Sequence, residues 1–354
     1  MDSQLVKKYL TDVNFQDPFF DSLKEDYEGF EQWIEKKKAE KCWAFVVEIN
    51  SLINGFLFLK SERGQTIEDV TPNLPKRKWL KIGTFKINPH GTRLGERFLK
   101  KAFDTAIVND FDALYVTVFP KHTALIDLFK KYGFVEIGIK NSSKGSELVF
   151  TKDLLHVTNN ILFDYPRFNL LGNNKFLLAI YPEYHTRLFP DSILNNEDFD
   201  IIQDISHTNS IEKVYICRMD CRQLKKNDIL LIYRTKAKDD TGYAYYRSVV
   251  TSVCTIEEIK SEQDFPTLDD YLAYCENYSV FSRQELTDWY NKKGGLFVIK
   301  MVYNAALRKR VTRGNLIENI GLNSQDRWGI VPLEDDQFVK IIKQGNVYES
   351  LIIN

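Results

Sequence analysis

A short loop with two arginines, residues 90–97 (His-Gly-Thr-Arg-Leu-Gly-Glu-Arg), has the residue types of an anion-binding site. A glycine-containing loop that opens a helix leaves backbone N–H groups unpaired at the positive end of the helix dipole, and such groups bind phosphate oxygens. Arg93 and Arg97 add cationic donors at the same place. The segment therefore predicts a site for an anionic cofactor.

The residues on either side of this loop predict the elements that position it. Apolar residues recur from Leu80 to Ile87 and stop before Pro89, because proline has no N–H to give to a strand ladder. From Leu94 to Ala106 the apolar residues follow helical spacing, which indicates an amphipathic helix. The loop is therefore expected to link a strand to the start of a helix.

A second strand and helix follow directly in the sequence. Residues 113–119 are rich in β-branched and aromatic residues, and Pro120 ends the run. Residues 123–132 have helical spacing, and Gly133 is a typical helix C-cap. Residues 134–137 and 148–151 are predicted strands around a turn at residues 141–145.

This order of motifs over residues 20–153 resembles the GNAT family of N-acetyltransferases. Ile87-Asn88-Pro89 matches the V-x-P strand end of that family, Gly95 lies where a small residue opens the helix, and residues 131–134 match its closing K-x-G-F. The resemblance implies an α/β (α+β) fold in which residues 1–153 form a mixed sheet flanked by helices. It also implies that acetyl-CoA is the cofactor.

The resemblance assigns a cofactor role to individual residues. Ile87 would polarise the thioester through its backbone N–H, and residues 93–97 would bind the pyrophosphate. The expected cofactor-binding residues are Phe85, Ile87, Arg93, Leu94, Gly95, Glu96, Arg97 and Phe129. Phe129 occupies the position of the frequent tyrosine general acid and has no hydroxyl, so cofactor binding is better supported than catalysis.

Two other side chains are candidates for the catalytic proton transfer. His122 precedes the predicted helix at Thr123, and an imidazole titrates near neutral pH. A capping or surface histidine is the alternative interpretation. Tyr132, beside Gly133, offers a second hydroxyl, but His122 is the preferred general base.

The residues before the first predicted strand have a helical pattern. Residues 1–40 are expected to be helical, with a helix starting at Asp17-Pro18. The early helices of GNAT proteins form one wall of the acceptor cleft, so Tyr27, Glu31 and Trp33 are either acceptor contacts or residues of a helix core. Residues 42–59 predict a hairpin, and residues 62–78 a polar loop.

Composition places the chain among globular proteins. It has 354 residues, enough for two domains, with 44% hydrophobic and 27% charged residues. No run of 18 apolar residues and no signal-peptide pattern is present, and the five cysteines are scattered, so a cytoplasmic protein without membrane contact or bound metal is expected. With a net charge of −1, any binding to nucleic acid must use a local patch.

Residues 154–172 lack periodicity and are expected to join the first domain to a second one over residues 173–354. Strands are predicted at residues 175–181, 212–217, 229–235, 242–254 and 295–303, and helices at 269–275, 282–291, 313–319 and 335–342. This order, with the Lys-Lys-Asn-Asp-Ile-Leu-Leu-Ile-Tyr-Arg-Thr run at 225–235, resembles PUA-like domains of the ASCH and EVE type. The resemblance implies a β-barrel with inserted helices, in which Asn227 replaces a turn glycine and adopts a positive φ.

PUA-like domains commonly bind RNA or a modified base, which implies a nucleic-acid-binding surface here. The expected residues are Tyr233, Arg234, Tyr243, Tyr245 and Arg247, with cross-strand packing as the alternative for the tyrosines. The loops around His185 and His207 suggest a ligand pocket, and Cys217 is expected in the core rather than in a zinc site. Arg308, Lys309 and Arg310 are either further RNA contacts or a solvated turn.

Two functions remain open from the sequence. The first is an acetyl-CoA-dependent N-acetyltransferase that modifies an RNA or an RNA-associated amine recruited by the second domain. The second is a weakly catalytic or non-catalytic acyl-CoA-binding scaffold joined to an RNA or modified-base reader, within a toxin–antitoxin or defence system.

Overall fold

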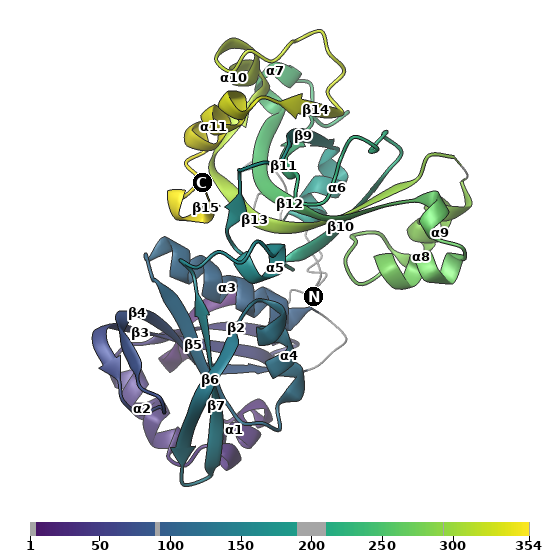
Figure 1. Ribbon diagram of the computed structural model, residues 1–354. Coiled ribbons are helices and arrows are strands. Elements are labelled where there is room, and N and C mark those ends of the chain that lie inside the picture. Colours follow the sequence, from purple (N-terminus) through teal and green to yellow (C-terminus); the bar gives the residue numbers. More distant parts are fainter. Residues whose placement is uncertain (1–4, 89–92, 190–209, 293, 354) are drawn as a thin grey trace. The chain divides into compact units, whose positions relative to one another are not determined.

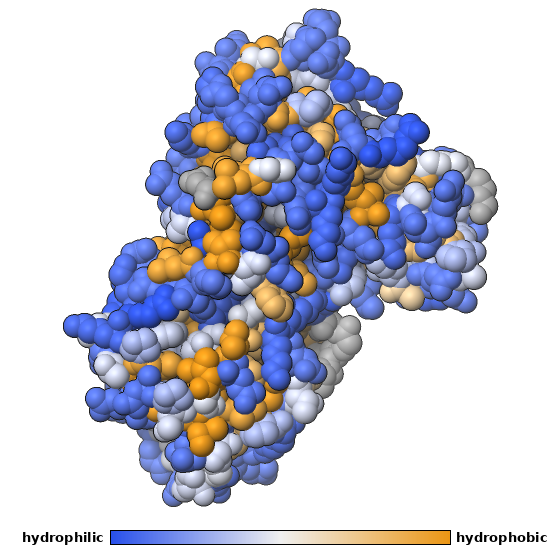
Figure 2. Space-filling model, in the orientation of Figure 1, coloured by the Kyte–Doolittle hydropathy of each residue, from blue (hydrophilic) through white to orange (hydrophobic). Residues whose placement is uncertain are grey.

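The computed structural model describes residues 5–88, 93–189, 210–292 and 294–353. The chain divides into two compact units, Met1–Asp164 and Tyr165–Asn354, each with a sheet of its own (Figure 1). The division falls inside the segment 154–172. Figure 2 shows that hydrophilic residues cover most of the visible surface and that hydrophobic residues occur there in small groups.

The first unit is built on a mixed seven-stranded sheet in the order β1-β2-β3-β4-β5-β7-β6. Only β4 and β5 run parallel to each other. The strands are β1 Leu5–Tyr9, β2 Trp43–Ile49, β3 Leu52–Ile67, β4 Leu74–Ile87, β5 Ala113–Val118, β6 Val135–Ser142 and β7 Gly145–Asp153. The helices are α1 Asp21–Asp26, α2 Phe30–Ala39, α3 Leu94–Val108, α4 Thr123–Lys131 and α5 Ile161–Asp164.

Helices pack on both faces of this sheet, as the neighbouring residues Gly55 and Phe56 of β3 show. Phe56 packs into the core formed with α1 and α2, where its ring lies 5.3 Å from that of Phe20. A Cβ atom at Gly55 would collide with the ring of Phe98 on α3. Successive strand residues point to opposite faces, so α2 and α3 must cover opposite sides of the sheet.

Most elements of the first unit agree with the sequence prediction, including α3, α4, β5 and the strands of the β6–β7 hairpin. Two predictions were wrong. Residues 5–9 form β1 rather than a helix, because they pair with β2 in the register Leu5↔Val47. Residues 62–78 are mostly strand, because β3 and β4 remain paired as far as Ile67↔Leu74.

The second unit contains an open six-stranded sheet in the order β10-β13-β12-β11-β9-β14, and a two-stranded sheet of β8 and β15. The strands are β8 Phe168–Asn169, β9 Lys175–Ile180, β10 Glu212–Cys217, β11 Ile229–Arg234, β12 Val249–Ser261, β13 Phe297–Thr312, β14 Ile330–Leu333 and β15 Ile352–Ile353. The helices are α6 Pro182–Leu188, α7 Ala244–Arg247, α8 Leu268–Cys275, α9 Arg283–Asn291, α10 Arg313–Glu318 and α11 Asp335–Gln344. Within the described residues β10 and β14 do not pair, so a closed barrel stays a prediction.

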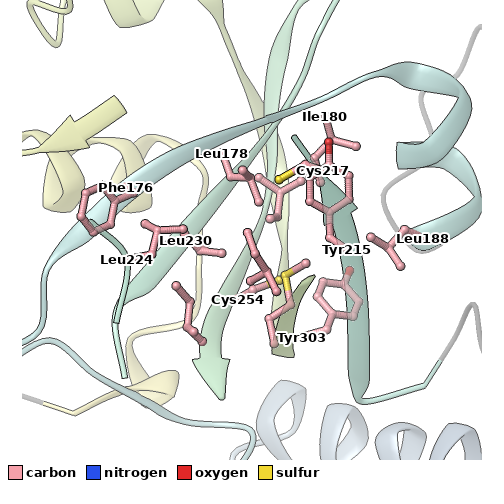
Figure 3. Packing of buried hydrophobic residues seen from close by; sticks show 14 of the residues in the cluster. Phe176, Leu178, Ile180, Leu188, Tyr215, Cys217, Leu224, Leu230, Cys254 and Tyr303 are labelled. Carbon is pink, nitrogen blue, oxygen red and sulfur yellow. The ribbon is translucent and has the colours of Figure 1, made fainter. Parts of the chain in front are cut away.

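The core of the second unit lies against this sheet. Leu178, Leu230, Cys254 and Tyr303 come from four neighbouring strands and lie together in Figure 3. Cys217 also belongs to this core, as predicted, and its Sγ lies 3.5 Å from that of Cys221. No group of three metal-binding side chains occurs among the residues that the structure describes.

Local sequence signals in the second unit were partly confirmed. Asn227 has a φ of 75°, as predicted for an asparagine at a glycine turn position. The helix predicted at 282–291 forms as α9, and Ser282 and Glu285 make a capping box at its start. The strand predicted at residues 242–254 was wrong in its first half, where α7 forms. Residues 308–310 lie inside β13 rather than in a turn.

Lys152 connects three elements of the first unit from a buried position. Its Nζ donates a hydrogen bond of 2.9 Å to the carbonyl oxygen of Tyr132, at the end of α4. It donates a second hydrogen bond to the carbonyl oxygen of Phe163 in α5. Burial lowers the pKa of Lys152 to about 7, although Asp164 and Asp153 oppose this shift. Because 10.5 is the usual value, the Lys152 side chain binds more protons in the unfolded than in the folded state between pH 7 and 10.5.

We therefore expect the contribution of Lys152 to the unfolding free energy to rise with pH across this window. The contribution of Lys152 is at most about 1.4 kcal/mol per pH unit. Lys152→Met keeps the stem but cannot titrate. The unfolding free energy of the wild type minus that of the variant should therefore increase from pH 7 to pH 10. Urea unfolding at several pH values measures this difference, and a constant difference would contradict the assignment.

Candidate active-site cavity

The sheet of the first unit opens between β4 and β5. These strands pair only from Trp79 to Ile82 and from Ala113 to Val116. Beyond this point β4 pairs with β3 alone, as far as Ile87, and β5 pairs with β7 as far as Val118. Residues 83–87 therefore present a strand edge that has lost its neighbour on one side.

A bulge at Gly83 coincides with the opening. Ile82 pairs with Leu59 and Thr84 with Phe58, so Gly83 is the extra residue on β4. A bulge bends its strand and strengthens the local twist, which separates β4 from β5. A Cβ atom at this position would lie 3.1 Å from Phe58 Cδ1, so glycine allows the close approach of the two strands.

The opening leads into a cavity of about 990 Å³, at the upper end of the size range of small-molecule sites. Both separated strand edges line it, together with the start of α4 and the segment that connects α1 to α2. Its walls include Tyr27, Trp33, Gly83, Phe85, Ile87, Thr117, His122, Leu125, Leu128 and Glu147. Of the predicted acceptor contacts, Tyr27 and Trp33 line the cavity.

His122 lies in the cavity wall as the residue that precedes α4. Its side chain is 41% exposed, and its Nε2 lies 3.6 Å from Asp26 Oδ2. Lys121 Nζ contacts the other oxygen of Asp26 at 2.5 Å. The pKa of the neighbouring Tyr27 is raised well above its usual range by burial, then by Glu147 and Asp26, so this phenol stays protonated.

The predicted cofactor residues occupy two places. Phe85 and Ile87 line the cavity, whereas Phe129 is fully buried behind Phe85, with ring centroids 5.8 Å apart. Arg93 precedes α3, and Leu94, Gly95, Glu96 and Arg97 are buried in its first turn. Residues 89–92, which complete the predicted loop, lie outside the described residues.

The first turn of α3 combines charge with close packing. Glu96 Oε1 accepts hydrogen bonds from Arg93 at 2.9 Å and from Lys131 at 3.2 Å. A Cβ atom at Gly95 would lie 3.0 Å from Leu128 Cδ2 and 3.4 Å from Ile87 Cδ1. Glycine is therefore needed here for the approach of α3 to α4 and β4, whether or not a phosphate binds nearby.

Tyr132, the second predicted catalytic residue, is fully buried at the end of α4. It is not among the described residues that line the cavity.

Several cavity residues carry charges that the sequence prediction missed. Glu147 and Thr117 lie on facing strands, and Thr117 Oγ1 donates to Glu147 Oε2 at 2.7 Å. Lys60, Lys81 and Lys140 line the same cavity. The bulge left one signal in the sequence, because the apolar alternation changes phase between Ile82 and Phe85.

The residues predicted to bind nucleic acid do not share a strand face. Tyr233 and Arg234 are buried, at 2% and 7% exposure, and Arg313 donates to the hydroxyl of Tyr233. Tyr243 precedes α7, while Tyr245 and Arg247 lie within it, so the strand predicted to carry these three residues was wrong here. The phenol of Tyr245 donates to Glu318 and its ring packs over Gly314, and these contacts hold the segment in a helical conformation.

The polar loops of the second unit form a different environment from the one expected. His185 lies in α6 and is fully buried, with Nε2 2.7 Å from Thr251 Oγ1. Burial lowers the pKa of His185 well below its usual value, as do the charges of Arg234 and Arg310. His207 lies outside the described residues.

Comparison with known proteins gives distant similarity only. No family model and no curated protein matches the chain. An ASCH protein from Zymomonas mobilis, crystallised as a point mutant, is 12% identical with a TM-score of 0.32, and the match covers 48% of this chain and 94% of that one. A ribosomal-protein-alanine N-acetyltransferase from Brucella melitensis is 16% identical with a TM-score of 0.32, over 42% of this chain and 100% of that one.

A GNAT family acetyltransferase from Elizabethkingia anophelis, with acetyl-CoA bound, is 13% identical with a TM-score of 0.31, over 43% of this chain and 100% of that one. Similarity at this level assigns neither a family nor an activity. Within the described residues, no helix has the length and apolar character needed to cross a membrane.

The buried position of Phe129 predicts the effect of restoring a hydroxyl there. Its ring packs against Phe85 and Phe134, at centroid distances of 5.8 and 5.0 Å. Phe129→Tyr should lower the unfolding free energy by about 1–3 kcal/mol, because the new hydroxyl is buried among rings. Phe163→Tyr adds the same group to a ring that is 45% exposed and should be neutral. Chemical denaturation compares the two, and equal stabilities would contradict the packing.

Proposed function

We propose that the first unit transfers an acetyl group from acetyl-CoA to an amine held in its cavity. The observation that carries this proposal is the separation of β4 from β5 at Gly83, which turns one edge of β4 towards a cavity of about 990 Å³. A strand edge without a neighbour has backbone N–H and C=O groups that need partners. The amide and thioester groups of an extended acyl-CoA arm are suitable partners for such an edge.

The residues around the cavity fit this cofactor. Residues 85–87 offer the open edge, and Leu125 and Leu128 of α4 offer an apolar wall. Arg93, at the start of α3, and Lys131 carry the cationic groups for the phosphates, although Glu96 contacts both. Acetyl-CoA, when bound, supplies an acetyl thioester, and the protein supplies its orientation.

We assign to His122 the role of general base that takes up the proton of the acceptor amine. The imidazole lines the cavity, and its Nε2 lies 3.6 Å from Asp26 Oδ2. Attack by a correctly held neutral amine needs positioning and polarisation of the thioester rather than a tyrosine acid. Phe129 is therefore compatible with catalysis, and Tyr132 is the less favoured candidate.

For the acceptor, we propose an RNA or an RNA-associated amine delivered by the second unit. The support is the resemblance to PUA-like domains and the exposure of Tyr243, Tyr246 and Arg247 around α7. The alternative is a non-catalytic acyl-CoA-binding scaffold, and the lack of a hydroxyl at Phe129 favours it. Retention of cofactor without transfer to any acceptor would identify the scaffold.

Binding of acetyl-CoA is the first test. Arg93→Gln should weaken the affinity by about 10-fold, because a hydrogen bond to a charged group contributes roughly 1.5–3 kcal/mol. Arg63→Gln removes an arginine on β3 that contacts Phe111 and Asn109 rather than the start of α3, and it should leave the affinity unchanged. Isothermal titration calorimetry with the full chain measures both. Equal affinities for wild type and Arg93→Gln would remove Arg93 from the site.

Catalysis by His122 is the second test. His122→Ala should lower kcat by about 100-fold or more and remove the rise of rate with pH near neutrality. Lys121→Ala is the matched control, because Lys121 contacts the same Asp26 and also lines the cavity. Transfer of radiolabelled acetyl groups to total tRNA, ribosomes and short peptides gives the rates. An unchanged pH–rate profile in His122→Ala would reject this role.

A further inference from the structure

Glu147 has a buried carboxylate on the cavity wall, and the proposed reaction does not use this residue. Its side chain is only 4% exposed, and its Oε2 accepts a hydrogen bond from Thr117. On β7 it pairs with Lys140 of β6, but no ion pair within 4.0 Å joins Glu147 to any cation that the structure describes. Burial, and then the charge of Glu147, raise the pKa of Tyr27, so the phenol at this end is neutral.

An ionised carboxylate in this environment needs a cation. Transfer of a carboxylate out of water is costly unless the charge is paired, and one hydroxyl does not replace a counter-charge. The nearest open space is the cavity itself, which Glu147, Thr117 and Tyr27 all line. A protonated amine in the cavity would supply the missing charge.

Lysines line the same wall, and one of them, Lys140, is the cross-strand partner of Glu147. Lys81 and Lys140 share one carboxylate, Asp69, at 3.9 and 2.7 Å, and Lys60 pairs with Glu62 at 2.5 Å. Three ammonium groups thus share two carboxylates, and among these five residues only the lysines line the cavity. Burial lowers the pKa of Lys81, and the charge of Lys140 lowers it further, whereas Asp69 and Glu62 oppose the shift.

We infer that the acceptor is an amine that also carries an anionic group, either a carboxylate or a phosphate. Glu147 binds its ammonium group, and Lys60, Lys81 and Lys140 bind the anion. Lys140 and Glu147 are cross-strand partners, so the two charges of the acceptor lie close together, as in an N-terminal segment with an acidic residue. This inference rests on the proposed function only where it calls the bound amine an acceptor. The binding that it predicts can be measured without acetyl transfer.

Calorimetric titration of the full chain with short peptide amides provides the test. The probes are Ala-Asp-Ala-Ala amide, its asparagine, lysine and phosphoserine versions at the second position, and the N-acetylated aspartate peptide. The aspartate or phosphoserine peptide should bind about 10-fold more tightly than the asparagine peptide, and the lysine peptide most weakly. N-acetylation should weaken binding about 10-fold. Whether aspartate or phosphoserine binds more tightly identifies the anion as carboxylate or phosphate.

Variants separate the two ends of the site. Glu147→Gln should abolish the difference between free and N-acetylated peptide, whereas Lys140→Gln should abolish the preference for aspartate over asparagine. Lys38→Gln, which removes a surface charge paired with Glu35, is the control. Thermal denaturation verifies that each variant is folded, and Lys81→Gln replaces Lys140→Gln if the latter is not.

Equal binding of the aspartate, asparagine and lysine peptides would overturn the inference, as would a Glu147→Gln variant that still distinguishes the N-acetylated peptide. Lack of binding of both acidic peptides at millimolar concentration would also overturn it. Acetyl-CoA is titrated separately. Peptide binding without acetyl-CoA binding would reject the proposed function and leave the amine and anion sites in place.

Discussion

Backbone hydrogen bonding is the constraint on which the first unit depends. In the interior of a protein almost every N–H and C=O group has a partner, and a central strand obtains its partners from both neighbours. β4 loses one neighbour at Gly83 although it lies in the middle of a seven-stranded sheet. Such an interruption is compatible with a stable fold only if solvent or a ligand reaches the exposed edge. A cavity at this place is therefore a consequence of the strand geometry.

The charges of the cavity follow a second constraint, which is the cost of burying an ion. Glu62 and Asp69 form ion pairs with lysines of the cavity wall and so compensate their charge. The carboxylate of Glu147 instead accepts a hydrogen bond from the hydroxyl of Thr117. The same principle describes Lys152, which is held by two carbonyl oxygens rather than by a carboxylate. The first unit thus contains charged groups of both signs whose compensation is incomplete, and those that line the cavity are available to a ligand.

The sequence predicted elements with strong periodicity and failed where tertiary pairing decides. The helices α3 and α4 and the strands β5 and β11 have apolar patterns of the correct period, and their neighbours do not alter them. The strand β1, with the sequence Leu-Val-Lys-Lys-Tyr, has little pattern of its own and exists because β2 pairs with it. The α7 segment alternates like a strand, but the packing of Tyr245 on Gly314 determines its conformation.

The candidate site was predictable in part. The motif resemblance led to Phe85, Ile87 and His122, which do line the cavity, and to residues 93–97, which lie at the start of α3. Glu147 was not predictable, because one glutamate in a strand of mixed composition resembles a surface residue until its neighbours are known. The lysines were missed for the same reason. A long basic side chain can cover an apolar wall and still present its charge to a cavity.

The bulge at Gly83 is an insertion of a single residue into an otherwise regular ladder. Without it, Ile82 and Thr84 would become adjacent opposite Leu59 and Phe58, and the register of β3 with β4 would be continuous. The apolar alternation before and after this point would then have one phase. In evolutionary terms, this irregularity at the edge of the cavity corresponds to a single codon, so the gain or loss of one codon is enough to interrupt or restore the β3–β4 ladder at this point.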